Sequence, residues 1–241
     1  MCRVHGHLAI FAAAYRMKHI LDNPIWWALH DDCKHLGQGS DQVKIFHPEV
    51  APFAAVSSDT TENFKGLYER IQNEQVVVMF SPKQDLDPSP LNIIANIPGI
   101  QMVFEGQVET SESLYEIVDL REAQIPKMLE LTQIAQPGPF SKRTIEFGGY
   151  CGIYDDERLV AMAGERLRTG HYTEISAVCS HPDYAGKGFA RKLVMHTVAQ
   201  ITANGQAPYL HVKSDNTRAI ELYQKLGFVK RSDMNFYVLS R

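Results

Sequence analysis

The stretch "YTEISAVCSHPDYAGKGFARKLVMHTVAQ", residues 172–200, constrains the fold more than any other part of the chain. Its first eight residues are rich in β-formers and lead to Pro182, so they predict a strand. Gly186 and Gly188 follow, one residue apart. The next apolar residues recur at helical spacing, which predicts an amphipathic helix: Phe189, Leu193, Val194, Val198 and Ile201. The sequence therefore predicts a strand, a glycine turn and a helix in direct succession.

A glycine turn in this position favours binding of an anion. It gathers unpaired backbone N–H groups at the positive end of a helix dipole, and small residues let a phosphate approach the backbone. The alternative is that the glycines only allow tight packing or a positive φ. "AGKGFA" lacks the spacing and the Lys-Ser/Thr ending of a P-loop, and no GxGxxG follows a strand in a βαβ unit. Nucleotide hydrolysis and dinucleotide redox chemistry are therefore disfavoured.

Composition excludes several classes of protein. The net charge of −4 gives no electrostatic reason to expect nucleic acid, and no apolar run approaches the roughly 20 residues that span a membrane. The four cysteines form no CxxC pair, so we expect free thiols in a reducing cytoplasm. "HDDCKH", residues 30–35, has metal-ligand residue types, but we expect no metal site there. A soluble cytoplasmic protein is the expectation.

The pattern of expected secondary structure changes near residue 110, which suggests that the chain has two parts. Short strands and a helix or two precede this point, and the polar run "QVETSES" reads as a linker. Beyond it we expect a strand, a helix, a hairpin and a further strand. Met17 starts a structured-looking segment, so we interpret residues 1–16 as an N-terminal extension. The predicted divisions are 1–16, 17–112 and 113–241.

A second element downstream identifies the family that the chain resembles. "NTRAIELYQKLGF", residues 216–228, follows the glycine turn at the separation and in the order found in the GNAT superfamily of acyl-CoA-dependent N-acyltransferases. The resemblance covers residues 113–241, and "TEISAVCSHPDYAGKGFARKL" is similar to the FR47-like subgroup. It implies an α+β fold with a central, mostly antiparallel twisted sheet flanked by helices. By analogy with that subgroup, a smaller degenerate GNAT-like α/β domain would precede it.

The resemblance implies acetyl-CoA as co-substrate and a set of cofactor contacts. Backbone groups near the end of the strand would hold the pantetheine arm, and the turn would hold the pyrophosphate. Superfamily members usually carry Arg or Gln where this chain has Ala185, and Lys187 could partly substitute as a point charge. Lys187 could equally be a solvated surface lysine, Asn216 a helix N-cap, and Cys179 a packing residue. The implied cofactor residues are Val178, Cys179, Ser180, Ala185, Gly186, Lys187, Gly188, Phe189, Ala190 and Asn216.

Three residues are candidates for the chemistry. Tyr223 matches the superfamily tyrosine that protonates the departing CoA sulfur, although it could be a packing residue. Glu174 is the first candidate for the base that deprotonates the amine, with a pKa raised toward neutral by burial. His211 is the second candidate, because its ordinary pKa near 6.5 suits the task. The alternatives are an exposed strand residue for Glu174 and a satisfied interior histidine for His211, which would leave solvent as the acceptor.

The expected activity is therefore acetyl transfer from acetyl-CoA to a primary amine by direct attack in a ternary complex. The acceptor would be a small-molecule or peptide amine, bordered by the loops "QPGPFSKRTIEFGGY" and "RLRTGHY", and the protein a monomer or homodimer. Two rival functions stay open. A catalytically silent CoA-binding sensor would keep the turn without needing Tyr223. An interaction scaffold would use the N-terminal half and bind no CoA.

Overall fold

The computed structural model describes residues 19–108 and 115–241. The proposed extension, residues 1–16, and the boundary near residue 112 lie outside the described residues. The helices are α1 (Pro24–His30), α2 (Thr61–Arg70), α3 (Ile125–Ala135), α4 (Phe189–Ala203) and α5 (Thr217–Lys225). The strands are β1 (Gly37–Gly39), β2 (Val43–Phe46), β3 (Ala54–Val56), β4 (Val76–Ser81), β5 (Asn92–Phe104), β6 (Val118–Asp119), β7 (Cys151–Asp155), β8 (Arg158–Thr169), β9 (Tyr172–Ser180), β10 (Ala207–Lys213) and β11 (Phe228–Ser240).

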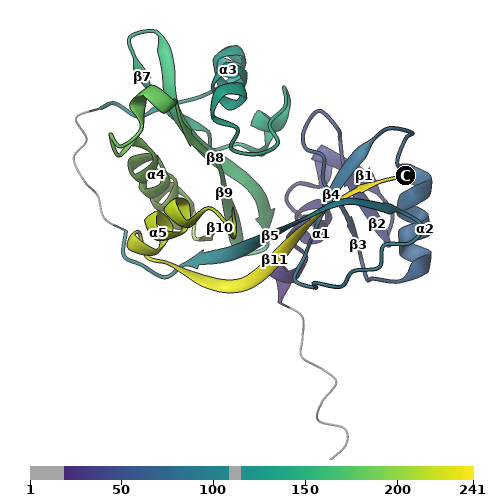
Figure 1. Ribbon diagram of the computed structural model, residues 1–241. Coiled ribbons are helices and arrows are strands. Elements are labelled where there is room, and N and C mark those ends of the chain that lie inside the picture. Colours follow the sequence, from purple (N-terminus) through teal and green to yellow (C-terminus); the bar gives the residue numbers. More distant parts are fainter. Residues whose placement is uncertain (1–18, 109–114) are drawn as a thin grey trace, which may run out of the picture.

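The large sheet has eight strands in the order β4-β11-β5-β10-β9-β8-β7-β6. Within the described residues its neighbouring pairs are antiparallel, except for β9 and β10. A small antiparallel sheet, β1-β2-β3, lies beside the β4 edge (Figure 1). The predicted α+β class with a mostly antiparallel, twisted central sheet is confirmed.

The long strands β5 and β11 join the two parts of the molecule (Figure 1). β5 and β11 pair with each other along most of their length. The C-terminal half of β11 also pairs with β4. Residues 99–103 of β5 also pair with β10, so β5 lies between β10 and β11. Segments on both sides of the expected boundary near residue 112 thus contribute to one sheet.

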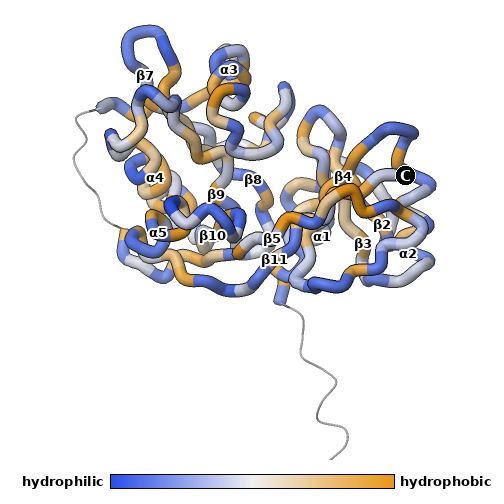
Figure 2. Tube along the Cα trace, in the orientation of Figure 1, coloured by the Kyte–Doolittle hydropathy of each residue, from blue (hydrophilic) through white to orange (hydrophobic). Residues whose placement is uncertain are grey.

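Helices cover both faces of the large sheet. α4 and α5 lie on one face and α3 lies on the other (Figure 1). Apolar side chains fill the layers, and the tube in Figure 2 is most strongly hydrophobic along strands such as β4. On the α4 and α5 face, Ile175, Val194, Leu210 and Tyr223 belong to one buried cluster. On the α3 face, Met128, Leu131, Tyr150, Met162 and Cys179 belong to another.

Local chemistry explains why several elements begin where they do. Asn23 caps α1 by accepting a hydrogen bond from the Trp26 N–H, and Pro126 occupies the first turn of α3, where a missing N–H costs nothing. The acidic turn between β7 and β8 forms the expected hairpin, with Asp156 at φ 51°. The β7–β8 hairpin is followed in the chain by β9, the strand that leads into the glycine turn.

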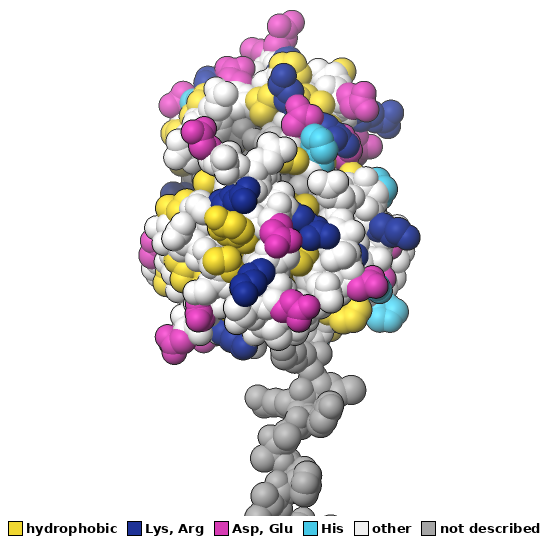
Figure 3. Space-filling view, turned by 90° about the vertical axis from the view of Figure 1, so that its right-hand side faces the viewer, with side chains coloured by type: hydrophobic (Ala, Val, Ile, Leu, Met, Phe, Trp, Pro, Cys, Tyr) yellow, Lys and Arg dark blue, Asp and Glu magenta, His cyan; other side chains and the backbone are white. Residues whose placement is uncertain are grey.

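The surface agrees with a protein of small net charge. On the face shown in Figure 3, which is that of the N-terminal part, acidic and basic side chains are interspersed. No helix in the described ranges is long and apolar enough to cross a membrane.

Candidate active site

The predicted glycine turn lies between β9 and α4 and presents free backbone donors. Gly186 and Gly188 have φ of 83° and 78°, which an L-side chain adopts only with strain. A Cβ atom added at either glycine meets nothing within 4 Å, so the turn is open on its outer side. Among the described residues, the N–H groups of Gly186, Gly188, Phe189 and Ala190 have no hydrogen-bond partner. They surround the N-terminus of a 15-residue helix and fit an anionic group.

Two other members of the predicted turn have their N–H groups engaged. The Ala185 N–H donates to Pro182 O at 3.0 Å, and the Lys187 N–H donates to Tyr184 O at 3.4 Å. The Lys187 ammonium lies 4.3 Å from the centre of the Tyr184 ring. Lys187 is exposed, and a cation–π contact with Tyr184 holds its ammonium beside the turn.

β9 and β10 separate just before the turn. Their parallel ladder runs from Ala207–Tyr172 to Leu210–Ile175 and ends there. On the other side, Gly164 pairs with Ser176 and Met162 pairs with Cys179, so β9 has one more residue than β8 in this interval. Ala177 lies in this bulge with φ 53°. The bulge turns the β9 backbone out of register next to Val178, Cys179 and Ser180.

Tyr223 lies on the face of the sheet that carries α4 and α5. It is buried in the cluster that contains Ile175 and the partly buried Val178, and its ring contacts the Phe228 ring at 5.9 Å. Burial raises the pKa of Tyr223 to about 12, so the phenol stays protonated near neutral pH. Tyr223 thus packs in the core and also keeps a proton to donate.

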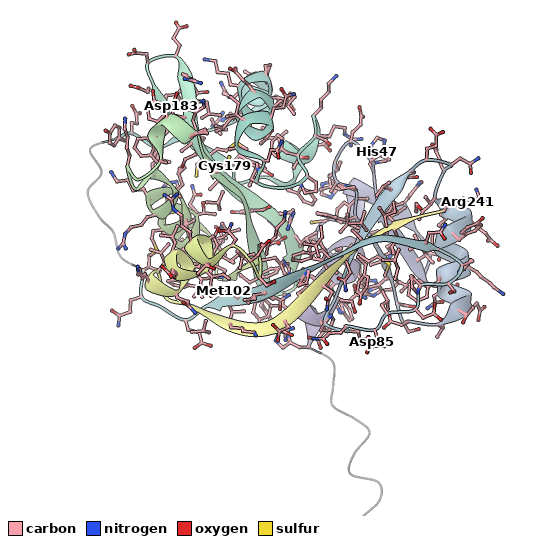
Figure 4. The ribbon with its side chains drawn as sticks, in the orientation of Figure 1. His47, Asp85, Met102, Cys179, Asp183 and Arg241 are labelled. Carbon is pink, nitrogen blue, oxygen red and sulfur yellow. The ribbon has the colours of Figure 1, made fainter. Side chains whose placement is uncertain are left out.

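Asn216 and Cys179 have clear structural roles. Asn216 Oδ1 accepts a hydrogen bond from the Ala219 N–H at 3.1 Å and caps α5. Cys179 is buried on the α3 face of β9, and burial raises the pKa of its thiol to about 12. Figure 4 shows Cys179 in the interior of the sheet, whereas Asp183 lies near the outer end that leads to the turn. The prediction that Cys179 is a packing residue is confirmed.

Glu174 and His211 meet in a buried polar cluster. Glu174 accepts two hydrogen bonds from the Arg166 guanidinium, at 2.7 and 2.6 Å, and its Oε1 lies 2.7 Å from His211 Nδ1. The Glu174 side chain is wholly buried, that of His211 is 3% exposed and that of Arg166 is 13% exposed. Glu174 is therefore no exposed strand residue, and His211 is an interior histidine with partners.

The charges of this cluster change the expected pKa of Glu174. Burial by itself disfavours the carboxylate, but Arg166 and His211 outweigh burial and lower the pKa of Glu174 to about 2. The expectation that burial raises this pKa toward neutral is wrong, because the sequence did not reveal the arginine. Burial lowers the pKa of His211, although Glu174 opposes this effect. His211 is thus neutral near pH 7, and Glu174 is ionised.

Further contacts fix the ring of His211. Gln101 Nε2 lies 2.9 Å from His211 Nε2 and donates to Leu21 O at 2.9 Å. Because an amide nitrogen only donates, Nε2 of the ring is the acceptor and Nδ1 carries the proton that Glu174 accepts. Gln101 Oε1 in turn accepts from Arg231, which pairs with Asp22. The cluster therefore connects β8, β9 and β10 with β5, β11 and the segment before α1.

Aromatic rings from the N-terminal part and from β11 cover this cluster. The Arg166 guanidinium lies 4.9 Å from the centre of the Phe53 ring and 5.7 Å from that of Phe80. The Phe80 and Phe236 rings contact the His211 ring at 4.9 and 5.7 Å. Sequence reasoning missed Arg166, Gln101 and these rings. For Arg166 no local signal existed, because a regular hairpin that turns at Gly170 would place Leu167 opposite Glu174. Only the register shift between Glu165–Ile175 and Arg168–Thr173 brings Arg166 there.

The described residues contain no group of three or more His, Cys, Asp or Glu side chains arranged to hold a metal ion. The open N–H groups of the turn, the separated strands and the buried tyrosine on α5 agree with the site that the resemblance to acyl-CoA-dependent N-acyltransferases implies.

Comparison with known proteins gives the family. Residues 150–238 match the FR47-like protein family. A putative acetyltransferase from the GNAT family of Novosphingobium aromaticivorans DSM 12444 is 33% identical, with a TM-score of 0.86 over 93% of this chain and 99% of that chain. The chain therefore belongs to the GNAT family of acetyltransferases, and GNAT acetyltransferases use acetyl-CoA.

More distant relatives agree with this assignment. The ribosomal protein bS18-alanine N-acetyltransferase of Salmonella typhimurium is 28% identical over 111 residues, which are 43% of this chain and 74% of the relative. A GCN5-related N-acetyltransferase from Kribbella flavida is 11% identical, with a TM-score of 0.58 over 84% of this chain and 88% of that chain. At that identity the likeness shows the fold alone.

Proposed function

We propose that the protein transfers the acetyl group of acetyl-CoA to a primary amine by direct attack in a ternary complex. The observation that carries this proposal is the juxtaposition of two features. Free N–H groups of Gly186, Gly188, Phe189 and Ala190 lie at the start of α4, and the β9–β10 ladder ends at Ile175, on the strand that leads into this turn. Together they offer a site for a phosphate and, beside it, free main chain for the arm that carries the thioester.

The residues present fit acetyl-CoA. The N–H groups of Gly186, Gly188, Phe189 and Ala190 would hold the pyrophosphate, with Lys187 as a nearby positive charge. Ala185 would contribute only backbone. Val178, Cys179 and Ser180 would hold the pantetheine arm through main-chain groups, as the family's strand does. Asn216 uses its Oδ1 as a cap, so its amide nitrogen is the atom left for the cofactor.

Tyr223 would act on the leaving group. The amine nitrogen attacks the thioester carbonyl carbon, a C–N bond forms, and the C–S bond breaks as the thiolate departs. A phenol with a raised pKa keeps its proton until negative charge develops on sulfur, and then donates it. Its place in the cluster with Val178 supports this role.

His211 would receive the proton that the amine loses. Its pKa is lowered, so the ring is neutral near pH 7 and Nε2 has a lone pair. Glu174 would hold the ring in this tautomer and would not itself be the base, since a carboxylate with a pKa of about 2 accepts protons poorly. Gln101 would have to give up its hydrogen bond to Nε2.

The charges of the Glu174 cluster indicate which kind of amine the site accepts. Arg166 already neutralises Glu174, so this carboxylate does not attract an ammonium group. An α-amine, with an ordinary pKa near 8, is partly neutral at physiological pH, whereas a lysine amine near 10.4 is almost wholly charged. The Salmonella relative is named for acting on an alanine of a ribosomal protein. We therefore propose an α-amine of a peptide or small molecule as the acceptor.

The test is an acetylation assay read by mass spectrometry. The purified chain is incubated with acetyl-CoA and two hexapeptides, one with a free N-terminal alanine and one N-terminally blocked with an internal lysine. We expect the first peptide to gain an acetyl group faster than the second. Binding of acetyl-CoA without acetylation of either peptide or of a small-amine panel would contradict the proposed activity.

A further inference from the structure

Tyr150 has a buried hydroxyl that the chemistry described above does not use. The residue is 3% exposed, and its Oη has no hydrogen-bond partner within residues 19–108 and 115–241. A buried hydroxyl without a partner is costly, and structures that retain one often use it for a ligand. Tyr150 is the last residue of the loop that sequence analysis places beside the acceptor.

The ring of Tyr150 has a defined position on the α3 face of the sheet. A Cβ atom added to Gly164 would lie 2.3 Å from Tyr150 Cδ1, so the ring covers this glycine directly. Gly164 pairs with Ser176, which is the first β9 residue after the ladder with β10 ends. Tyr150 therefore lies over the point where β9 leaves β10, on the face opposite the one that carries Tyr223.

The hydroxyl of Tyr150 is neutral and lies beside a polar cavity. Burial raises the pKa of Tyr150 above its ordinary range, and the charges of Arg166 and Glu174 lie close enough to influence it. Phe140, from the loop after α3, contacts the ring at 5.8 Å. Tyr150 also borders a cavity of about 550 Å³ that reaches the C-terminal end of α4, and its lining includes charged side chains of both signs: Asp119, Arg121, Glu165 and Arg168. A neutral hydroxyl in this position can accept one hydrogen bond from an N–H group and donate another.

We propose that Tyr150 is an acceptor-binding residue whose hydroxyl holds the neutral amine on the α3 face of β9 before attack. The inference rests on the proposed function and adds a residue and a side of approach to it. The amine enters from the α3 face, and Tyr223 serves the thiolate from the opposite face. The two tyrosines act on different atoms of the same transfer.

The test compares Tyr150→Phe with the wild type and with Tyr154→Phe, which removes a partly buried hydroxyl from the same apolar cluster. The probe is the hexapeptide with a free N-terminal alanine or, if that is not acetylated, the best substrate of the small-amine panel. We expect kcat/KM for the probe to fall about tenfold in Tyr150→Phe, which is the typical value of one hydrogen bond, while KM for acetyl-CoA stays within about twofold. Tyr154→Phe should match the wild type.

The melting temperature of Tyr150→Phe distinguishes a role of the hydroxyl in binding from a role in stabilising the fold. Because the hydroxyl has no partner in the free protein, Tyr150→Phe should melt at the same temperature as the wild type or higher. Its rate–pH profile should keep the wild-type shape, since Tyr150 does not titrate. An unchanged kcat/KM would overturn the inference, and so would a lost activity that parallels a lowered melting temperature. If the wild type acetylates no probe, the proposed function itself is contradicted, and the inference that rests on it fails too.

Discussion

Arg166 and Glu174 form a bidentate ion pair across β8 and β9, with N–O distances of 2.7 and 2.6 Å and a carboxylate that no solvent reaches. The pair lies where aromatic rings of the N-terminal part meet the large sheet. The pair therefore lies at the contact between the large sheet and the N-terminal part of the chain.

Glu174→Gln should destabilise the protein strongly. The substitution leaves the Arg166 guanidinium buried without its counter-charge, which typically costs about 3 to 5 kcal/mol in the free energy of unfolding. Arg143 and Glu146 provide a matched control, because they form a bidentate pair of similar geometry whose side chains are each 37% exposed. Glu146→Gln should cost less than about 1 kcal/mol. Urea denaturation measures both values, and equal losses would show that burial of the Glu174 pair has no special effect.

The stability of the wild type should fall in acid because of the same carboxylate. The pKa of Glu174 is lowered from 4.5 to about 2 in the folded protein, so the folded state binds its proton less readily than the unfolded state. The resulting stabilisation is complete above pH 4.5 and is lost as pH falls toward 2. Unfolding free energies measured between these values should decline less steeply in Glu174→Gln than in the wild type. Parallel declines would mean that Glu174 has an ordinary pKa.

Tyr223→Phe should lower kcat by about a hundredfold, because general acid catalysis contributes on that order. KM for acetyl-CoA should change little, since the ring and its packing remain. Steady-state kinetics with the alanine hexapeptide measure both quantities. Tyr68→Phe, a substitution in the N-terminal part, is the control and should be silent. If Tyr223→Phe retains the wild-type kcat, the thiolate does not need this proton.

His211→Gln should remove the acidic limb of the rate–pH profile. In the wild type, kcat should fall as pH drops below 6.5 toward the lowered pKa of His211, where the ring becomes charged and no longer accepts a proton. The variant should be at least about tenfold slower near neutral pH and lack this limb. His30→Gln, in an exposed residue, is the control. A variant with the wild-type rate and profile would point to solvent as the proton acceptor.

Local sequence patterns predicted the turn and the helices, because glycine at positive φ and helical periodicity are properties of neighbouring residues. The strand, turn and helix from Tyr172 to Ala203 and the helix from Thr217 appear where expected. The place of β5 between β10 and β11 was not predictable in this way, since it depends on pairing between segments more than a hundred residues apart.

The candidate site was only partly predictable for the same reason. Glu174 and His211 were chosen by residue type and strand position, and the structure brings them together. Arg166 makes the pKa of Glu174 fall where burial alone would raise it. The β8–β9 hairpin brings Arg166 opposite Glu174 because its register shifts between the pairs Glu165–Ile175 and Arg168–Thr173. The rings of Phe53 and Phe80, which cover the pair, come from the N-terminal part of the chain. No local sequence pattern predicts that they lie there.

The central claim is that the turn at Gly188 holds the pyrophosphate of acetyl-CoA, and calorimetric titration of two variants tests it most directly. Asn and Asp both tolerate positive φ and have nearly the same shape, so Gly188→Asn and Gly188→Asp differ mainly in charge. We predict one-to-one binding by the wild type, and binding to the Asp variant at least about tenfold weaker than to the Asn variant, because a carboxylate would face the phosphates. Equal affinities for the wild type and both variants, or no binding by the folded wild type, would contradict the claim.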